Sequence, residues 1–192
     1  PAGARGSQRP GGLGCGCTMS DAGGTLPQAP LCWDLCPHAS RAGAEASKGP
    51  RGTVVESLGK VWLFTIAEAG WRARSGARVA EIGPLPVRRD GQYSAMYMEA
   101  IFTPGMTSSI HTHSGLEAWY TASGETCLET PKGTMVGRAG GAPVIVPEGL
   151  PMHLTATGTV QRRPVVPILH DAHPPPTTVR PEWIPQACAK KP

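Results

Sequence analysis

The sequence has no apolar run long enough to cross a membrane as a helix, which takes about 18 residues or more. The longest candidate, VWLFTIAEAGW at residues 61–71, is interrupted by Glu68. We therefore expect a soluble protein, cytoplasmic or secreted, that has no membrane partner. The chain begins at Pro1 and shows no basic-then-apolar secretory pattern, so the sequence leaves its location open.

Charged residues are also few and nearly balanced. Lys and Arg number 18 against 14 Asp and Glu, a formal net charge of +4 in 192 residues. The basic residues are scattered and form no run longer than a pair, whereas nucleic-acid binders carry basic tracts or faces with interleaved aromatic residues. Nucleic acid is therefore not expected as a partner.

The six cysteines lack the paired C-x2-C spacing of structural zinc sites. Four of them fall near the start of the chain, as Cys15-x-Cys17 and Cys32-x3-Cys36. Cys127 and Cys188 are the pair that we consider for a structural disulfide.

Glycine and proline, in contrast, are abundant, with 25 and 21 residues, and many lie at the two ends. Residues 1–52 have no sustained apolar period and predict a disordered or loosely docked leader. Its cluster LCWDLC, at residues 31–36, is expected to dock on the domain or to form a local loop. Residues 173–192 predict an extended tail with Trp183 and Ile184 as anchors, because its prolines cannot pair in a sheet.

Residues 53–172 are expected to form one domain. They consist of short apolar runs separated by turn signals such as RRDGQ, TPGM, ASGET and PEG, the pattern of an all-β sandwich or barrel. Strands are expected at residues 53–59, 60–70, 77–83, 93–102, 108–113, 116–122, 126–130, 134–139, 142–147, 153–159 and 163–170. Both alternating faces of the run at 60–70 are apolar, so it is either buried on both sides within the chain or lies in a subunit contact.

Residues 105–124, GMTSSIHTHSGLEAWYTASG, bring together two histidines, a glutamate and two bounding glycines. Alternate side chains of a strand share a face, so His111 and His113 can meet one ion. Glu117 has the same parity, but four residues of extended chain would place it roughly 13 Å from His113. We expect Ser114-Gly115 to reverse the chain in a hairpin that returns Glu117 to the two imidazoles.

Two histidines and one carboxylate form a facial triad that leaves positions on a metal open for oxygen or substrate. His153 is the candidate for a fourth ligand, because it follows the turn PEGLPMH and opens an expected strand on which it can face inward. A histidine on a strand is more often a surface or hydrogen-bonded residue, and H-x-H alone is a weak signal. Its combination with Glu117 and the glycines predicts a metal site.

The same stretch resembles the first cupin motif, G-x5-H-x-H-x3-E-x6-G, at every defined position: Gly105, His111, His113, Glu117 and Gly124. Residues 141–153, GAPVIVPEGLPMH, resemble the second motif, G-x5-P-x-G-x2-H-x3-N, through Gly141, Pro147, Gly149 and His153. The sequence departs from that motif twice: three residues instead of two separate Gly149 from His153, and Thr157 stands where the motif has Asn. The resemblance covers residues 85–172.

The resemblance implies a double-stranded β-helix, or jelly-roll barrel, with one divalent transition metal held by His111, His113, Glu117 and His153. Cupins use Fe, Mn, Ni, Cu or Zn, and the residues do not fix which. The resemblance also implies a homodimer formed through the two-sided strand at 60–70.

Four further residues are expected at the pocket. Trp119 shares the parity of Glu117 and faces inward, either lining the pocket or as plain barrel core. Thr155 and Thr157 share the parity of His153 and are expected to line the pocket as hydroxyl donors. His170 ends its strand and either contacts the metal region or lies at a rim.

The ligand set with open positions favours an oxidoreductase of the dioxygenase type acting on a small oxygen-bearing or aromatic molecule. Glu117 is then a candidate catalytic residue as well as a ligand, since a carboxylate that loosens from the metal can take a substrate proton. Two alternatives stay open because one fold supports many chemistries: a metal-dependent isomerase or lyase, and a binding or sensing module without turnover.

Overall fold

The computed structural model of the chain describes residues 14–21, 26, 29–88, 91–180 and 182–188. Fourteen strands and one helix lie in these ranges: β1 (Gly14–Asp21), β2 (Leu31–His38), α1 (Arg41–Ser47), β3 (Gly52–Ser57), β4 (Lys60–Glu68), β5 (Ala80–Ile82), β6 (Tyr93–Ile101), β7 (His111–His113), β8 (Gly115–Ser123), β9 (Glu125–Thr130), β10 (Gly133–Arg138), β11 (Val144–Val146), β12 (His153–Thr157), β13 (Arg163–Asp171) and β14 (Thr177–Val179). Within them no helix has the length and apolar character needed to cross a membrane.

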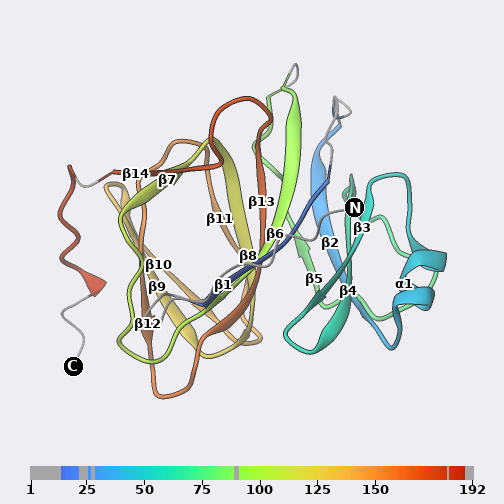
Figure 1. Ribbon diagram of the computed structural model, residues 1–192, viewed down its shortest axis with the longest axis horizontal. Coiled ribbons are helices and arrows are strands. Elements are labelled where there is room, and N and C mark those ends of the chain that lie inside the picture. Colours follow the sequence, from blue (N-terminus) through green and yellow to red (C-terminus); the bar gives the residue numbers. More distant parts are fainter. Residues whose placement is uncertain (1–13, 22–25, 27–28, 89–90, 181, 189–192) are drawn as a thin grey trace, which may run out of the picture.

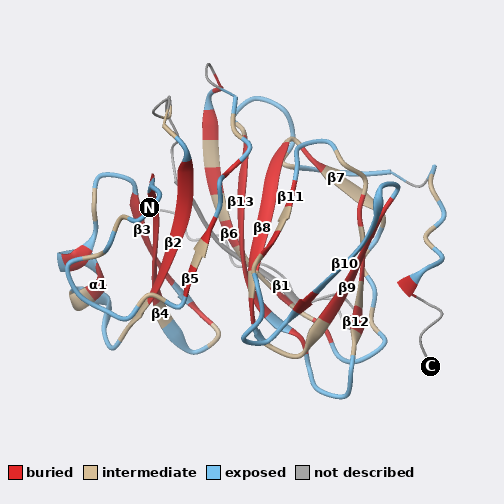
Figure 2. Cartoon of the chain, turned by 180° about the vertical axis from the view of Figure 1, so that it is seen from behind, coloured by how far each residue is buried: buried red, intermediate tan, exposed pale blue. Residues whose placement is uncertain are grey.

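Each of the eleven expected strands coincides with one of the strands β3 to β13. The all-β class is therefore confirmed, since α1 is a single short helix among the described residues. Figure 2 shows that the central strands are buried, whereas most of the connecting turns are exposed. This distribution follows from the alternation of apolar runs and Gly- or Pro-containing turns along the sequence.

Two antiparallel sheets face each other and form a barrel (Figure 1). The five-stranded sheet has the order β1-β6-β13-β8-β11, and the three-stranded sheet has the order β10-β9-β12. Both sheets contribute side chains to one buried core, including Trp119 and Ile168 from the first sheet and Leu128 and Leu154 from the second. A two-stranded sheet, β14-β7, pairs the C-terminal tail with the strand that carries His111 and His113.

A four-stranded sheet, β3-β4-β2-β5, lies against the outer face of the five-stranded sheet (Figure 1). Residues 31–47, expected in a disordered or loosely docked leader, form its strand β2 and the helix α1. β2 is a central strand that pairs with β4 and β5. Strands β3 to β5, expected in the barrel at 53–172, belong to this outer sheet as well. Residues 14–21 of the expected leader form β1 of the five-stranded sheet, and residues 1–13, 22–25 and 27–28 lie outside the described residues.

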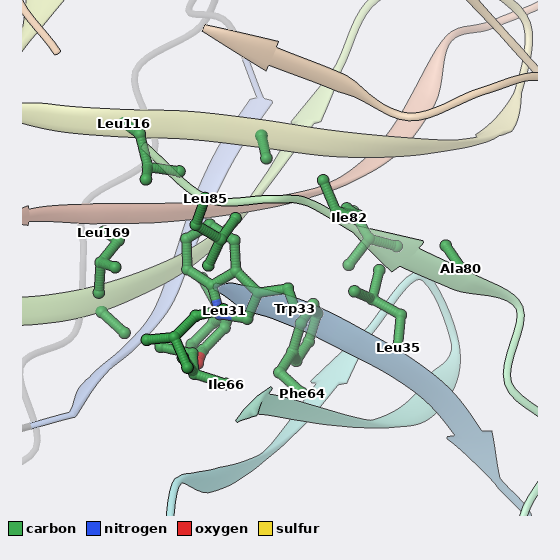
Figure 3. Packing of buried hydrophobic residues seen from close by; sticks show 14 of the residues in the cluster. Leu31, Trp33, Leu35, Phe64, Ile66, Ala80, Ile82, Leu85, Leu116 and Leu169 are labelled. Carbon is green, nitrogen blue, oxygen red and sulfur yellow. The ribbon is translucent and has the colours of Figure 1, made fainter. Parts of the chain in front are cut away.

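The largest hydrophobic core fixes the four-stranded sheet on the barrel. Figure 3 shows members from both sheets: Leu31, Trp33 and Leu35 of β2, Phe64 and Ile66 of β4, Leu116 of β8 and Leu169 of β13. Burying one such large apolar side chain contributes about 1.5–3 kcal/mol. Burial on this scale explains why LCWDLC forms a strand in spite of its Gly- and Pro-rich surroundings. The five-stranded sheet is consequently the middle of three layers, buried on both faces.

Both apolar faces of β4 are covered within the chain. Trp62 and Phe64 point into the core between the sheets. On the other face, Leu63 packs in a second cluster with Cys36, Ala44 of α1 and Val54. The apolar surface that suggested a subunit contact is thus used inside the chain, and the homodimer stays a prediction.

The tail beyond residue 172 is held in two places. Residues Thr177–Val179 form β14, which no proline interrupts, and Cys188 forms a disulfide with Cys127 of β9 across a sequence separation of 61. This confirms the disulfide considered from the cysteine spacing. Ile184 is 74% exposed and is not an anchor, whereas Cys188 is buried.

Candidate metal centre

Strands β7 and β8 bring His111, His113 and Glu117 together. One possible ligand atom of each lies within 4.8 Å of those of the other two. Nε2 of His113 lies 2.6 Å from Oε2 of Glu117, and the centroids of the two imidazole rings are 4.9 Å apart. Among the described residues, no other three His, Cys, Asp or Glu side chains are grouped in this way.

The chain turns a corner at Ser114 and does not form the expected hairpin. β7 pairs with β14, whereas β8 pairs with β13 and β11. The chain therefore leaves one sheet and enters another, and this change of direction brings Glu117 back to His113. Gly115 permits the corner, because a Cβ atom there would overlap the carbonyl oxygen of Leu169 on β13. The hairpin prediction is wrong, although the three side chains converge.

Backbone carbonyls orient both imidazoles. Nδ1 of His111 donates to the carbonyl of Ser109 over 2.8 Å, and Nδ1 of His113 donates to the carbonyl of Pro176 over 2.9 Å. Because a carbonyl only accepts hydrogen bonds, each Nδ1 carries the hydrogen. In a neutral ring this leaves Nε2 as the nitrogen that can bind a metal.

Burial and mutual charge set the protonation of the three groups. Burial lowers the pKa of His111, which favours its neutral, metal-binding form. Burial acts in the same direction on His113, but the hydrogen bond and charge of Glu117 outweigh it and raise the pKa of His113. Burial works to raise the pKa of Glu117, yet His113, His111 and Arg162 together hold it below its ordinary value. Glu117 is therefore an ionised carboxylate at neutral pH.

This donor set fits a divalent transition metal ion. Two ring nitrogens and one carboxylate are the ligands of the facial triad, which occupies one side of an ion. His113 and Glu117 are 5% and 4% exposed, so the site is shielded from bulk water. The donors do not fix the identity of the metal, since Fe, Mn, Ni, Cu and Zn all accept imidazole and carboxylate ligands.

A cavity of about 280 Å³ lies beside the three groups. Its remaining lining is mostly apolar: Met98, Ala100, Phe102, Ser108, Ser109, Leu154, Val166, Thr177 and Val179. Thr177 and Val179 belong to the tail strand β14, so the tail forms part of the wall. The sequence pattern identified none of these lining residues.

The threonines expected at the pocket face away from it. Leu154 and Ala156 of β12 are buried in the barrel core, so Thr155 and Thr157 occupy the opposite face. Thr157 donates there to Glu125 over 2.6 Å. The apolar alternation of Met152, Leu154 and Ala156 is the sequence signal that identifies the inward face.

Trp119 and His170 also lie outside the cavity lining. Trp119 faces inward, as expected, but is fully buried in the barrel core, which is the second of the two roles considered for it. His170 is buried on β13, where its Nδ1 donates to the carbonyl of Asp171 over 2.7 Å. Neither residue belongs to the group of three possible ligands.

His153 is not grouped with the other three residues, and its role as a ligand stays a prediction. It opens β12 on the same outer face as Thr155 and Thr157, where it pairs with Glu129 of β9. The physical reason is strand parity: the extra residue after Gly149 shifts the chain by one position, and a shift of one residue moves a side chain to the other face.

Comparison with known proteins found solved structures that are similar to part of the chain. No protein-family model and no curated protein sequence matches it. An oxalate oxidase in complex with the substrate analogue glycolate is 21% identical, with 44% of this chain and 45% of that chain covered and a TM-score of 0.38. A cupin-like protein from Thermotoga maritima is 15% identical over 45% and 64% of the chains, with a TM-score of 0.39. An uncharacterized protein with a double-stranded β-helix domain from Klebsiella pneumoniae is 16% identical over 53% and 80%, with a TM-score of 0.40.

These likenesses are partial, and the chain spans less than half of the oxalate oxidase chain. Activities and substrates are therefore not transferred from them. The barrel is recognised from its own construction: two facing antiparallel sheets, with His111, His113 and Glu117 of the first motif on β7 and β8. The chain thus has the antiparallel two-sheet barrel that the resemblance to the cupin motifs implies.

Proposed function

We propose that this protein binds one divalent transition metal ion through His111, His113 and Glu117 and acts as an oxidoreductase of the dioxygenase type on a small molecule. The observation that carries the proposal is the convergence of these three side chains at the wall of a cavity. A bound divalent ion would supply a Lewis-acid centre with positions left open on the cavity side.

The chain's own residues suit this task in three ways. The carbonyls of Ser109 and Pro176 hold the imidazoles in one tautomer. The apolar walls exclude water and accept a hydrocarbon or aromatic body, so the molecule would carry its oxygen atoms at the end facing Glu117. Glu117, as the ionised carboxylate, is the group placed to accept a proton from that end.

Metal content is the first test. Protein purified without added metal is subjected to elemental analysis, alongside His111→Ala, Glu117→Ala and the control His173→Ala, whose side chain is 83% exposed. We expect about one ion per chain in the wild type and the control, and loss of the ion in the two site variants. Retention of the ion in both site variants would rule out the site.

Oxygen consumption is the second test. Protein loaded in turn with Fe(II), Mn(II), Ni(II) or Cu(II) is assayed for oxygen uptake with flavonols, enediols and dicarboxylates. Oxygen uptake that disappears in Glu117→Ala supports the proposal. Turnover that continues without oxygen would instead indicate an isomerase or lyase, and a small molecule recovered unchanged from the purified protein would indicate a binding module.

A further inference from the structure

The second motif of the barrel carries its histidine one position later than the motif requires. With two intervening residues after Gly149, the motif position falls on Met152, and with three it falls on His153. The turn at Gly149 is held against strand β7, because the N–H of Gly149 donates to the carbonyl of His113 over 3.0 Å. The chain therefore enters β12 from a fixed point. The extra residue shifts by one position the side chains that face inward on this strand.

Met152 lies directly opposite His111. The two residues form an antiparallel bridge in which the N–H of His111 donates to the carbonyl of Met152 over 3.1 Å and the N–H of Met152 donates back over 2.9 Å. Side chains of directly opposed residues project from the same face of a sheet. The Met152 side chain is 1% exposed and packs in the barrel core with Leu154 and Ala156.

His153 lies on the other face of β12, although its ring is near enough to His111 for an electrostatic interaction. Its neighbour across the ladder is Glu129, whose carboxylate accepts the backbone N–H groups of the tail. Its strand neighbours on the same face, Thr155 and Thr157, pair with Cys127 and Glu125. To reach the ion, the imidazole would have to cross to the face now filled by Met152 and Leu154, which requires a change of register along β12.

We propose that Met152 stands where the second motif has its metal-binding histidine and that it does not bind the ion. The ion then has three protein ligands, His111, His113 and Glu117. The proposal rests on the metal binding proposed above and defines its ligand count. A thioether is a soft and weak donor compared with an imidazole. The ion therefore keeps one more position for water or for a substrate that chelates through two atoms, and it is bound less tightly than by four ligands.

Metal affinity measured by titration calorimetry tests the assignment. Co(II) is added to metal-free wild type and to three variants, His153→Ala, Met152→Leu and Met152→His, and the visible absorption of each Co(II) form is recorded. We expect His153→Ala and Met152→Leu to keep the wild-type affinity and spectrum. Met152→His is expected to bind Co(II) about tenfold more tightly or better, the scale on which single groups around a metal site change affinity, with a changed spectrum.

The outcomes separate this assignment from metal binding itself. Wild type that binds no Co(II) would contradict the proposed function. Given wild-type binding, a tenfold weaker affinity in His153→Ala or in Met152→Leu would overturn the three-ligand site. Unchanged affinity and spectrum in a folded Met152→His would show that residue 152 does not face the ion. Should Met152→His not fold, the other two variants still decide the ligand count.

Discussion

The backbone carbonyl of Pro176 accepts the hydrogen bond of Nδ1 of His113, although 63 residues separate the two in the sequence. The hydroxyl of Thr177 lies 3.1 Å from the same nitrogen, and β14 pairs with β7 along its length. The C-terminal tail thus fixes the tautomer and direction of the candidate ligand His113 from outside the barrel. Carbonyl partners of this kind raise the basicity of ligating histidines and hold their rings in place.

Release of the tail is predicted to weaken metal binding. Cys188→Ser removes the disulfide to Cys127, whose separation of 61 residues corresponds to about 4 kcal/mol in the chain-entropy treatment. We expect a lower free energy of unfolding and a loss of about 10–100-fold in metal affinity, because the Pro176 carbonyl is no longer held against His113. Chemical denaturation and calorimetric titration with Co(II) measure the two effects.

A reductant provides the control for this prediction. Dithiothreitol should reproduce the loss of affinity in the wild type and have no effect on the double variant Cys127→Ser/Cys188→Ser. The buried thiols of Cys32 and Cys36 are already unpaired, so their reduction cannot contribute. Equal metal affinity in oxidised and reduced wild type would show that β14 holds its place without the disulfide.

Glu129 is predicted to make tail docking sensitive to acid. Its carboxylate accepts backbone N–H groups from Gln186, Ala187 and Cys188 over 2.5, 2.8 and 3.0 Å. Burial works to raise the pKa of Glu129, but these hydrogen bonds outweigh it and lower the pKa. The contribution of Glu129 to tail docking is therefore complete above its unfolded-state pKa of about 4.3. It is lost as the pH falls through its lower folded-state pKa.

Amide hydrogen exchange at residues 186–188 checks this prediction. Glu129→Gln should speed exchange already at neutral pH, by an amount equivalent to about 2 kcal/mol, and should abolish the additional loss of protection in acid. Glu68→Gln, at the exposed end of β4, serves as the matched control and should behave as the wild type. Similar exchange in Glu129→Gln and wild type would mean that the disulfide alone fixes the tail.

Gly115→Ala is predicted to disrupt the corner that brings Glu117 to His113. A Cβ atom at this position would overlap the carbonyl oxygen of Leu169 and Cα of His170 in the paired strand β13. Since β8 and β13 are paired and buried at this point, we expect a loss of about 3 kcal/mol or more in the free energy of unfolding, together with weaker metal binding. Gly141→Ala, on an exposed turn, is the control and should cost about 1 kcal/mol or less.

The three possible ligands were predictable from the sequence because their arrangement is local. His111, His113 and Glu117 lie within seven residues, and alternation on a strand plus one change of direction is enough to bring them together. The all-β class was predictable for a related reason, since turn residues and apolar runs mark each strand separately.

Three features of the fold and the site depend on contacts that no local pattern contains. The strand β2 forms because Trp33 and Leu35 are buried in one cluster with Leu116 and Leu169, which lie far along the chain. The face of β12 on which the His153 side chain lies depends on the turn before the strand, because one additional residue in that turn moves the side chain to the other face. The carbonyl of Pro176 reaches His113 only through the position of the whole tail. Motif spacing identifies the possible ligands, but these long-range contacts determine their surroundings.

Arg162 is predicted to be the strongest single polar contributor to the barrel core. It is fully buried, its guanidinium lies 5.1 Å from the ring centroid of Phe102 and 5.6 Å from that of Trp119, and Nη1 donates to the carbonyl of Ala100 over 2.9 Å. Arg162→Ala leaves a void and removes these partners, so we expect a loss of about 3–5 kcal/mol in the free energy of unfolding.

Two variants serve for comparison. Substitution of the exposed neighbour, Arg163→Ala, should change the free energy of unfolding by about 0.5 kcal/mol or less. Arg162→Lys keeps the charge but not the planar fork and should fall between them. Chemical denaturation of the three variants tests the order, and equal losses for Arg162→Ala and Arg163→Ala would contradict it.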